Sequence, residues 1–177
     1  MKFLIKLIVL CFLPISAFAS ECPALLNHQF KTLQGTVVDL CQYQDNPILV
    51  VNTASKCGFA PQFEKLEALS AQYKSRGLLV IGFPSNDFKQ ELQNNNEIGD
   101  FCKLTYGVKF PMVVKSSVTG DSANPFYKQL IAASGKSPKW NFHKYIIMPG
   151  GKSVHSFSTM TEPDDPAIMK LIRPSLK

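Results

Sequence analysis

Cys57 has the clearest potential for chemistry in this chain, because of the pattern on either side of it. It follows the apolar run 48–53, which predicts a buried strand. It precedes a helical pattern over about 58–75, in which apolar residues recur every three or four positions. A cysteine at a helix N-terminus faces unpaired backbone N–H groups and the positive end of the helix dipole, and both favour the reactive thiolate. The alternative from position alone is a buried, inert thiol.

Cys102 is a second candidate, in a helix predicted to start near Asn94. Asn94 and Glu97 have the spacing of a capping box. Ile98 and Cys102 then lie on one mostly apolar face, so a role as a small core residue is a stronger alternative for Cys102 than for Cys57. No CxxC pair is present, because Ala60 stands three positions after Cys57. A simple dithiol–disulfide exchanger is therefore disfavoured.

The first 19 residues have the pattern of a secretory signal peptide. Lys2 and Lys6 precede an apolar stretch, and small residues at 17 and 19 predict cleavage after Ala19. The apolar stretch is shorter than the roughly 20 residues that a spanning helix needs. We therefore expect export to the periplasm or beyond, with a single mature domain over 20–177.

Cys22 and Cys41 flank a predicted hairpin, 30–33 and 37–40, with a turn at Gly35. If the strands pair, these two cysteines come together, and a disulfide there would add roughly 3 kcal/mol in the chain-entropy model. Other pairings among the four mature cysteines stay open. The cysteines and the three histidines (His28, His143 and His155) are too dispersed to indicate a metal site, and no cofactor is expected.

The net charge of +6 does not indicate nucleic-acid binding. The basic residues are scattered, and removal of Lys2 and Lys6 would leave +4. No run of basic residues is interleaved with aromatic ones, so the charge is typical of a solvated surface.

The elements that must position Cys57 form a βαβ unit over 48–83. The second strand, 78–83, is nearly all apolar, as expected for a parallel strand that is covered on both faces. The polar loop 85–88 follows it, at the same carboxyl edge of the sheet as Cys57, where open α/β sheets bind ligands. A short strand at 111–114, a helix at 125–133, a hairpin at 144–148 and 154–158 and a helix at 163–172 complete the order. This order predicts an α/β fold of thioredoxin-like type, with a central mixed sheet flanked by helices and an N-terminal β-hairpin.

Four separated segments carry a more specific signal: 52–62 (NTASKCGFAPQ), 82–88 (GFPSNDF), 101–111 (FCKLTYGVKFP) and 140–144 (WNFHK). In these segments, and in their order, the chain resembles the glutathione peroxidase family over almost all of its mature length. The resemblance implies a thioredoxin fold and a thiol peroxidase that reduces hydrogen peroxide or organic hydroperoxides. It places Cys57 at the peroxidatic position, with Trp140 and Asn141 holding the reactive sulfur.

The sequence departs from the family motif at two positions, and one of them, the glutamine, belongs to the family's site. Where the family has Phe-Pro-Cys-Asn-Gln-Phe, this chain has Ser85 and Asp87 in place of cysteine and glutamine. A neutral amide donates hydrogen bonds, whereas an ionised carboxylate only accepts them and disfavours a neighbouring thiolate. Three outcomes are open: Asp87 is protonated and donates, it turns away and leaves Asn86 or backbone N–H groups in its place, or the enzyme is weak.

The resemblance also implies how the cycle closes. The helix after the Phe-Pro loop carries the resolving cysteine in thioredoxin-dependent relatives, and Cys102 is the candidate here. Without it, glutathione or a partner thiol would reduce Cys57 directly. The stretch 135–139 is short, whereas tetrameric relatives carry a longer insertion there, so a monomer reduced by a thioredoxin-like protein is expected. The alternatives are a non-catalytic peroxide sensor or partner-binding protein and a thiol–disulfide exchanger.

Overall fold

A central four-stranded mixed sheet organises the computed structural model, which describes residues 21–177. The predicted signal peptide, Met1–Ala19, lies outside the described residues. Within this sheet, the first two strands along the chain pair in parallel, and the last two are added antiparallel. The strands, in spatial order, are β4 (Leu79–Pro84), β3 (Ile48–Thr53), β5 (Lys144–Ile147) and β6 (Val154–Phe157).

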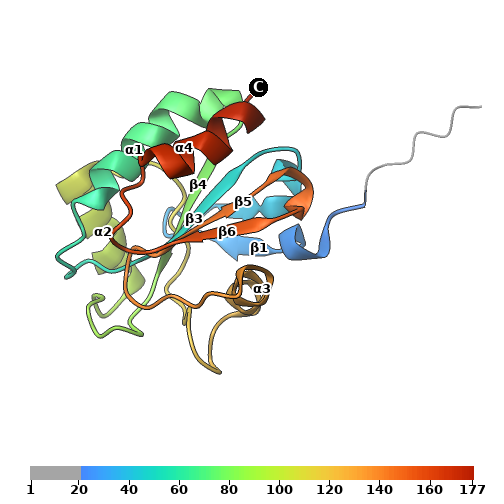
Figure 1. Cartoon of the computed structure of the whole chain (residues 1–177). Coiled ribbons are helices and arrows are strands. Elements are labelled where there is room, and N and C mark those ends of the chain that lie inside the picture. The colour runs from blue at the N-terminus through green and yellow to red at the C-terminus, as the bar shows by residue number, and fades with distance from the viewer. Residues whose placement is uncertain (1–20) are drawn as a thin grey trace, which may run out of the picture.

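Helices cover both faces of this sheet (Figure 1). Along β3, Leu49 and Val51 belong to one buried cluster, whereas Ile48 and Val50 belong to the other. The first cluster includes residues of the helices α1 and α4, and the second includes residues of α3. This alternation explains why the central strands read as unbroken apolar runs. The helices are α1 (Gln62–Tyr73), α2 (Asn95–Tyr106), α3 (Pro125–Ser134) and α4 (Pro166–Ile172).

The N-terminal hairpin is formed by β1 (Gln29–Lys31) and β2 (Val37–Asp39), which pair antiparallel. A disulfide joins Cys22 to Cys41 across the ends of this hairpin, with their Cα atoms 5.6 Å apart. The fold class expected from the sequence is therefore confirmed: a mixed sheet flanked by helices, preceded by an antiparallel hairpin.

Two predicted boundaries and one predicted strand are wrong. The first long helix starts at Gln62 and not near 58, and the last starts at Pro166 and not at 163. The segment 111–114 makes only single bridges, from Met112 to Gly82 and from Val113 to Thr32. Pro111 has no N–H to donate, which limits any longer ladder.

Gly82 allows this segment to lie close to β4. A Cβ atom at Gly82 would come within 2.3 Å of the Met112 sulfur, so any larger residue there would force the buried Met112 side chain to move. No helix in the described part of the chain is long and apolar enough to cross a membrane.

Candidate functional site

Cys57 lies in the turn between β3 and α1, at the carboxyl edge of the sheet. Its side chain is only 6% exposed, and the Phe59 N–H donates to its sulfur at 3.5 Å. Because α1 begins five residues later, at Gln62, the expected placement of Cys57 at the helix N-terminus is wrong. The backbone donor to the sulfur comes from the turn itself.

The loop after β4 holds this turn in place. The Lys56 N–H donates to the Gln90 carbonyl at 2.9 Å, and the Ser55 N–H donates to Glu91 Oε1 at 3.0 Å. Glu91 is buried, and burial raises the pKa of its carboxyl above the ordinary value. Both residues that precede Cys57 are thus tied to one neighbouring loop.

Asn141 meets the same loop from the other side. It is fully buried, and its Nδ2 donates to Gln90 Oε1 at 2.9 Å. Its neighbour Trp140 is fixed through its carbonyl, which accepts from Asn52 Nδ2 at 3.1 Å. The indole is 40% exposed and packs against the Phe88 ring, with centroids 5.4 Å apart. The structure therefore brings Trp140 and Asn141 to the edge where Cys57 lies.

Asp87 is bonded to a different loop. Its Oδ2 accepts from the Val118 N–H at 2.7 Å and from the Thr119 N–H at 3.0 Å. Two backbone donors thus hold one oxygen of this side chain. Of the three possibilities open from the sequence, the geometry matches the one in which Asp87 turns away.

We expect Asp87→Ala to change stability more than peroxide reactivity. Loss of the two hydrogen bonds that the Asp87 side chain accepts should lower the free energy of unfolding by about 1–3 kcal/mol, whereas the rate of Cys57 oxidation should stay within about threefold. Urea denaturation and stopped-flow oxidation measure the two effects, and Asp87→Asn, which keeps an acceptor oxygen, should lose less stability. A large rate loss at unchanged stability would place Asp87 at the reacting sulfur.

A buried lysine connects the segments that lie beneath the site. Lys144 is fully buried on β5, and its Nζ donates to Gln62 Oε1, to the Thr159 carbonyl at 3.3 Å and to the Thr161 carbonyl at 2.7 Å. Burial lowers its pKa to about 8. Thr159 Oγ1 in turn donates to the Asn141 carbonyl at 2.7 Å. The first residue of α1 and the segment that carries Asn141 are thus joined through one ammonium group.

Cys102 lies on the buried face of α2 and is 3% exposed. Burial, with a further contribution from the charge of Glu91, raises the pKa of its thiol to about 12. At neutral pH this group is almost entirely protonated, so it is a poor nucleophile while α2 is folded.

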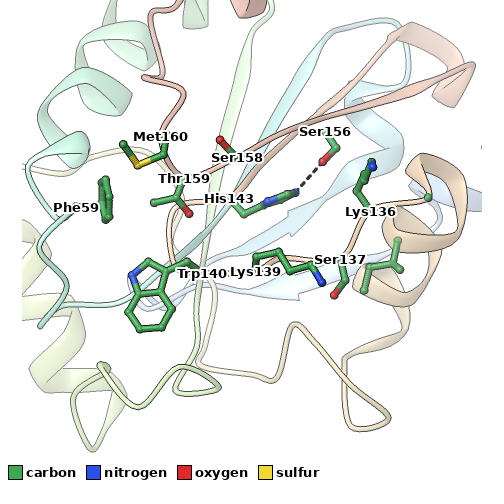
Figure 2. Close-up of a pocket in the computed structure, with 12 residues that line it drawn as sticks. Phe59, Lys136, Ser137, Lys139, Trp140, His143, Ser156, Ser158, Thr159 and Met160 are labelled. Atoms are coloured by element: carbon green, nitrogen blue, oxygen red, sulfur yellow. Dashed lines mark hydrogen bonds between the residues drawn. The ribbon is translucent and has the colours of Figure 1, made fainter.

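An open cavity of about 970 Å³ lies beside the Cys57 turn. Figure 2 shows Phe59, Trp140 and Met160 gathered at one end of this cavity, with Lys136, Ser137 and Lys139 towards the other. His143 also lines it and bonds to Ser156 Oγ at 2.8 Å; burial lowers the pKa of its imidazole to about 4, so it is neutral at neutral pH. The cavity can take an apolar group at the end near Cys57 and an anion at the other.

Comparison with known proteins agrees with this arrangement. The family model described as "Glutathione peroxidase" matches residues 25–131. The chain belongs to the glutathione peroxidase family. It is 35% identical over 178 residues to the thioredoxin/glutathione peroxidase BtuE of Escherichia coli, a match that covers 86% of this chain and 97% of that one.

Two further relatives agree. The hydroperoxy fatty acid reductase gpx1 of Synechocystis is 40% identical over 146 residues, or 76% of this chain and 86% of that one. The crystal structure of T. cruzi GPX1 superposes with a TM-score of 0.65 at 29% identity, over 85% of this chain and 94% of that one. The chain is thus a thiol peroxidase, an enzyme that acts on peroxide, as the sequence predicted.

Three residues of the site were missed as such from the sequence: Gln90, Glu91 and Lys144. Gln90 and Glu91 fall in the polar loop after a buried strand, a place that indicates ligand binding in general but no role for one residue. Lys144 is the first residue of the fully buried strand β5, and a lysine directly before an apolar run is the signal that could have identified it. Within residues 21–177, no group of three or more histidine, cysteine or acidic side chains could hold a metal ion.

Proposed function

We propose that Cys57 is the peroxidatic residue and that Trp140 and Asn141 complete its site. The observation that carries this proposal is the hydrogen bond from the Phe59 N–H to the buried Cys57 sulfur. It lies at the carboxyl edge of the sheet, where Asn141 also lies. The Cys57 thiolate attacks one oxygen of the hydroperoxide and the O–O bond breaks. The leaving alkoxide or hydroxide takes a proton and departs as alcohol or water. Sulfur is oxidised to a sulfenic acid as the peroxide is reduced.

Organic hydroperoxides that carry a carboxylate are the proposed preferred substrates. The apolar wall made by Phe59, Trp140 and Met160 suits a hydrocarbon chain, and Lys136 and Lys139 suit an anionic end. The Synechocystis relative is named as a hydroperoxy fatty acid reductase, which supports the same substrate class.

This substrate preference has a direct test. Met160 is 74% exposed at the rim of the cavity. Met160→Glu therefore places a charge where the hydrocarbon chain of the substrate would bind, and it should have little effect on the protein core. We expect kcat/KM for a fatty acid hydroperoxide to fall about tenfold or more, with the value for hydrogen peroxide within twofold. Val37→Glu, at an exposed apolar residue of the hairpin, is the control. An equal loss of kcat/KM for both peroxides would exclude this cavity as the binding site for the hydrocarbon chain.

Cys102 is the proposed resolving cysteine, through local opening of α2. Only Ile98 and Cys102 of this helix are buried, and Gly99 in its interior costs about 1 kcal/mol relative to alanine. Few buried contacts and a weak helix former favour local unfolding. After opening, the Cys102 sulfur attacks the Cys57 sulfenic acid and releases water, and the resulting disulfide is reduced by an external dithiol. The alternative is direct reduction of Cys57 by glutathione.

The reductant is proposed to be a thioredoxin-like protein, and the E. coli relative, named as a thioredoxin/glutathione peroxidase, supports this proposal. Steady-state peroxide consumption with a thioredoxin system and with glutathione, at equal thiol concentrations, separates the two donors. If peroxide is not consumed with either donor, the non-catalytic sensor or partner-binding protein would be favoured.

Export to the periplasm is proposed from the predicted signal peptide, and the Cys22–Cys41 disulfide supports an oxidising compartment.

A monomer is proposed from the short stretch 135–139, and size-exclusion chromatography with light scattering tests it.

A further inference from the structure

Gln90 connects the two halves of the site. Its backbone carbonyl accepts from the Lys56 N–H at 2.9 Å, next to Cys57, and its side-chain Oε1 accepts from Asn141 Nδ2 at 2.9 Å. Asp87, at the position where the family has glutamine, is bonded to the 118–119 backbone instead. The primary amide that bonds to Asn141 in this chain therefore belongs to Gln90.

Backbone strain is concentrated on both sides of this hydrogen bond. Among the described residues, only Lys89 and Phe142 have positive φ without being glycine, at 60° and 61°. Lys89 precedes Gln90, and Phe142 follows Asn141. The left-handed conformation costs a non-glycine residue roughly 1–2 kcal/mol, and such residues persist where the surroundings fix them, often at functional sites. The two amides are thus held in their places at a cost.

Asn141 also has an unused acceptor. Its Nδ2 donates a hydrogen bond to Gln90, whereas its Oδ1 is buried and has no partner among the described residues. Asn52 Oδ1 and Thr53 Oγ1, at the end of β3 that leads to Cys57, are likewise buried and unpartnered. A buried acceptor left unpaired costs about 1–3 kcal/mol, and the O–H of a hydroperoxide is a donor that would pair it.

We propose that Gln90 is a positioning residue for the peroxidase reaction: by accepting from Nδ2 it orients the Asn141 amide, so that Oδ1 accepts from the O–H of the hydroperoxide. This inference rests on the proposed role of Cys57. It assigns to Gln90 the site function that the replacement of glutamine by Asp87 leaves open. No redox step is added, because Gln90 acts only through Asn141.

The test compares peroxide oxidation of Cys57 with its alkylation by iodoacetamide. Gln90→Met keeps the side-chain volume and the backbone carbonyl but removes the acceptor. We expect the rate constant for hydroperoxide to fall about 10- to 100-fold, whereas alkylation, which needs the thiolate but no hydroperoxide acceptor, stays within about threefold. Gln93→Met, at an exposed glutamine three residues on, is the matched control and should leave both rates unchanged.

Two further variants separate positioning from a merely structural role. If Gln90 acts through Asn141, Gln90→Met should add no further loss in an Asn141→Ala background. Gln90→Glu keeps an acceptor but adds a negative charge that disfavours the thiolate, so its rate–pH profile should move to higher pH while its plateau stays within a few-fold of the wild type.

Three results would overturn the inference: a Gln90→Met protein that reacts with peroxide at the wild-type rate, equal losses in oxidation and alkylation, or additive losses with Asn141→Ala. A wild-type protein in which Cys57 does not react with peroxide would overturn the proposed function as well, and that outcome is distinct from the other three.

Discussion

Replacement of Cys57 by serine is expected to lower kcat/KM for any hydroperoxide by at least about a thousandfold, to the background of the assay. A serine hydroxyl is not ionised at neutral pH, whereas a thiolate is a strong nucleophile. Within residues 21–177 the hydrogen-bond partner of the Cys57 sulfur is the Phe59 N–H, which is a donor and not a base. The substitution removes one polarisable atom from a turn that is held by backbone hydrogen bonds from Lys56 and Ser55. The fold should therefore be kept, as circular dichroism and urea denaturation would check.

Cys102→Ser is the matched control, because it changes the same atom in the other free cysteine of residues 21–177. It should leave the first oxidation of Cys57 at the wild-type rate and slow only turnover with a thioredoxin-like donor. Substantial peroxidase activity in Cys57→Ser would assign the chemistry to another residue.

Replacement of Lys144 by methionine is expected to cause the largest loss of stability, about 3 kcal/mol in the free energy of unfolding. Methionine keeps much of the aliphatic stem but donates nothing. Gln62 Oε1 and the carbonyls of Thr159 and Thr161 would lose the ammonium donor that they share. The Thr159 carbonyl would keep its hydrogen bond from Gln62 Nε2 at 2.9 Å. Each of the other two acceptors left unpaired costs about 1–3 kcal/mol, and relief of the desolvated charge offsets part of the sum.

The same variant has a pH signature. The folded-state pKa of Lys144 is lowered to about 8 from 10.5, so between these values the unfolded chain binds more protons than the folded one. The contribution of Lys144 to the free energy of unfolding therefore rises with pH from about 8 to 10.5.

Cys102 contributes in the opposite direction, because its pKa is raised from 9.0 to about 12 in the folded state. The difference between the wild type and Lys144→Met isolates the lysine, and this difference should widen between pH 8 and 10.5. Urea denaturation at fixed ionic strength measures it. A difference that is constant with pH would mean that folding does not lower the pKa of Lys144, and a small difference would mean that its hydrogen bonds contribute little to stability.

The parts of the fold that local patterns dictate were predictable from the sequence. The apolar runs over 48–53 and 78–83 became the parallel strands β3 and β4 nearly residue for residue, because strands covered on both faces are formed mostly by apolar residues. The cap at Asn94 formed as its spacing indicated, with Oδ1 accepting from the Glu97 N–H at 3.0 Å.

The features that depend on tertiary contacts were not predictable. Helical periodicity extends into the turn after Cys57, because Phe59 packs against the same core as the helix does, so the pattern could not locate the start of α1 at Gln62. The direction of Asp87 is decided by N–H groups some thirty residues further along the chain. The hydrogen bond between Asn141 and Gln90 spans 51 residues, and no local signal indicates it.

The central claim is that a hydroperoxide oxidises Cys57, and the most direct measurement is intact-mass and peptide mass spectrometry after one equivalent of hydroperoxide. In Cys102→Ser we predict one added oxygen, located at Cys57 as a sulfenic acid that dimedone captures. In the wild type we predict rapid conversion of that species to a Cys57–Cys102 disulfide. A Cys57 that stays reduced in both proteins would contradict the account and would favour a non-catalytic role for this site.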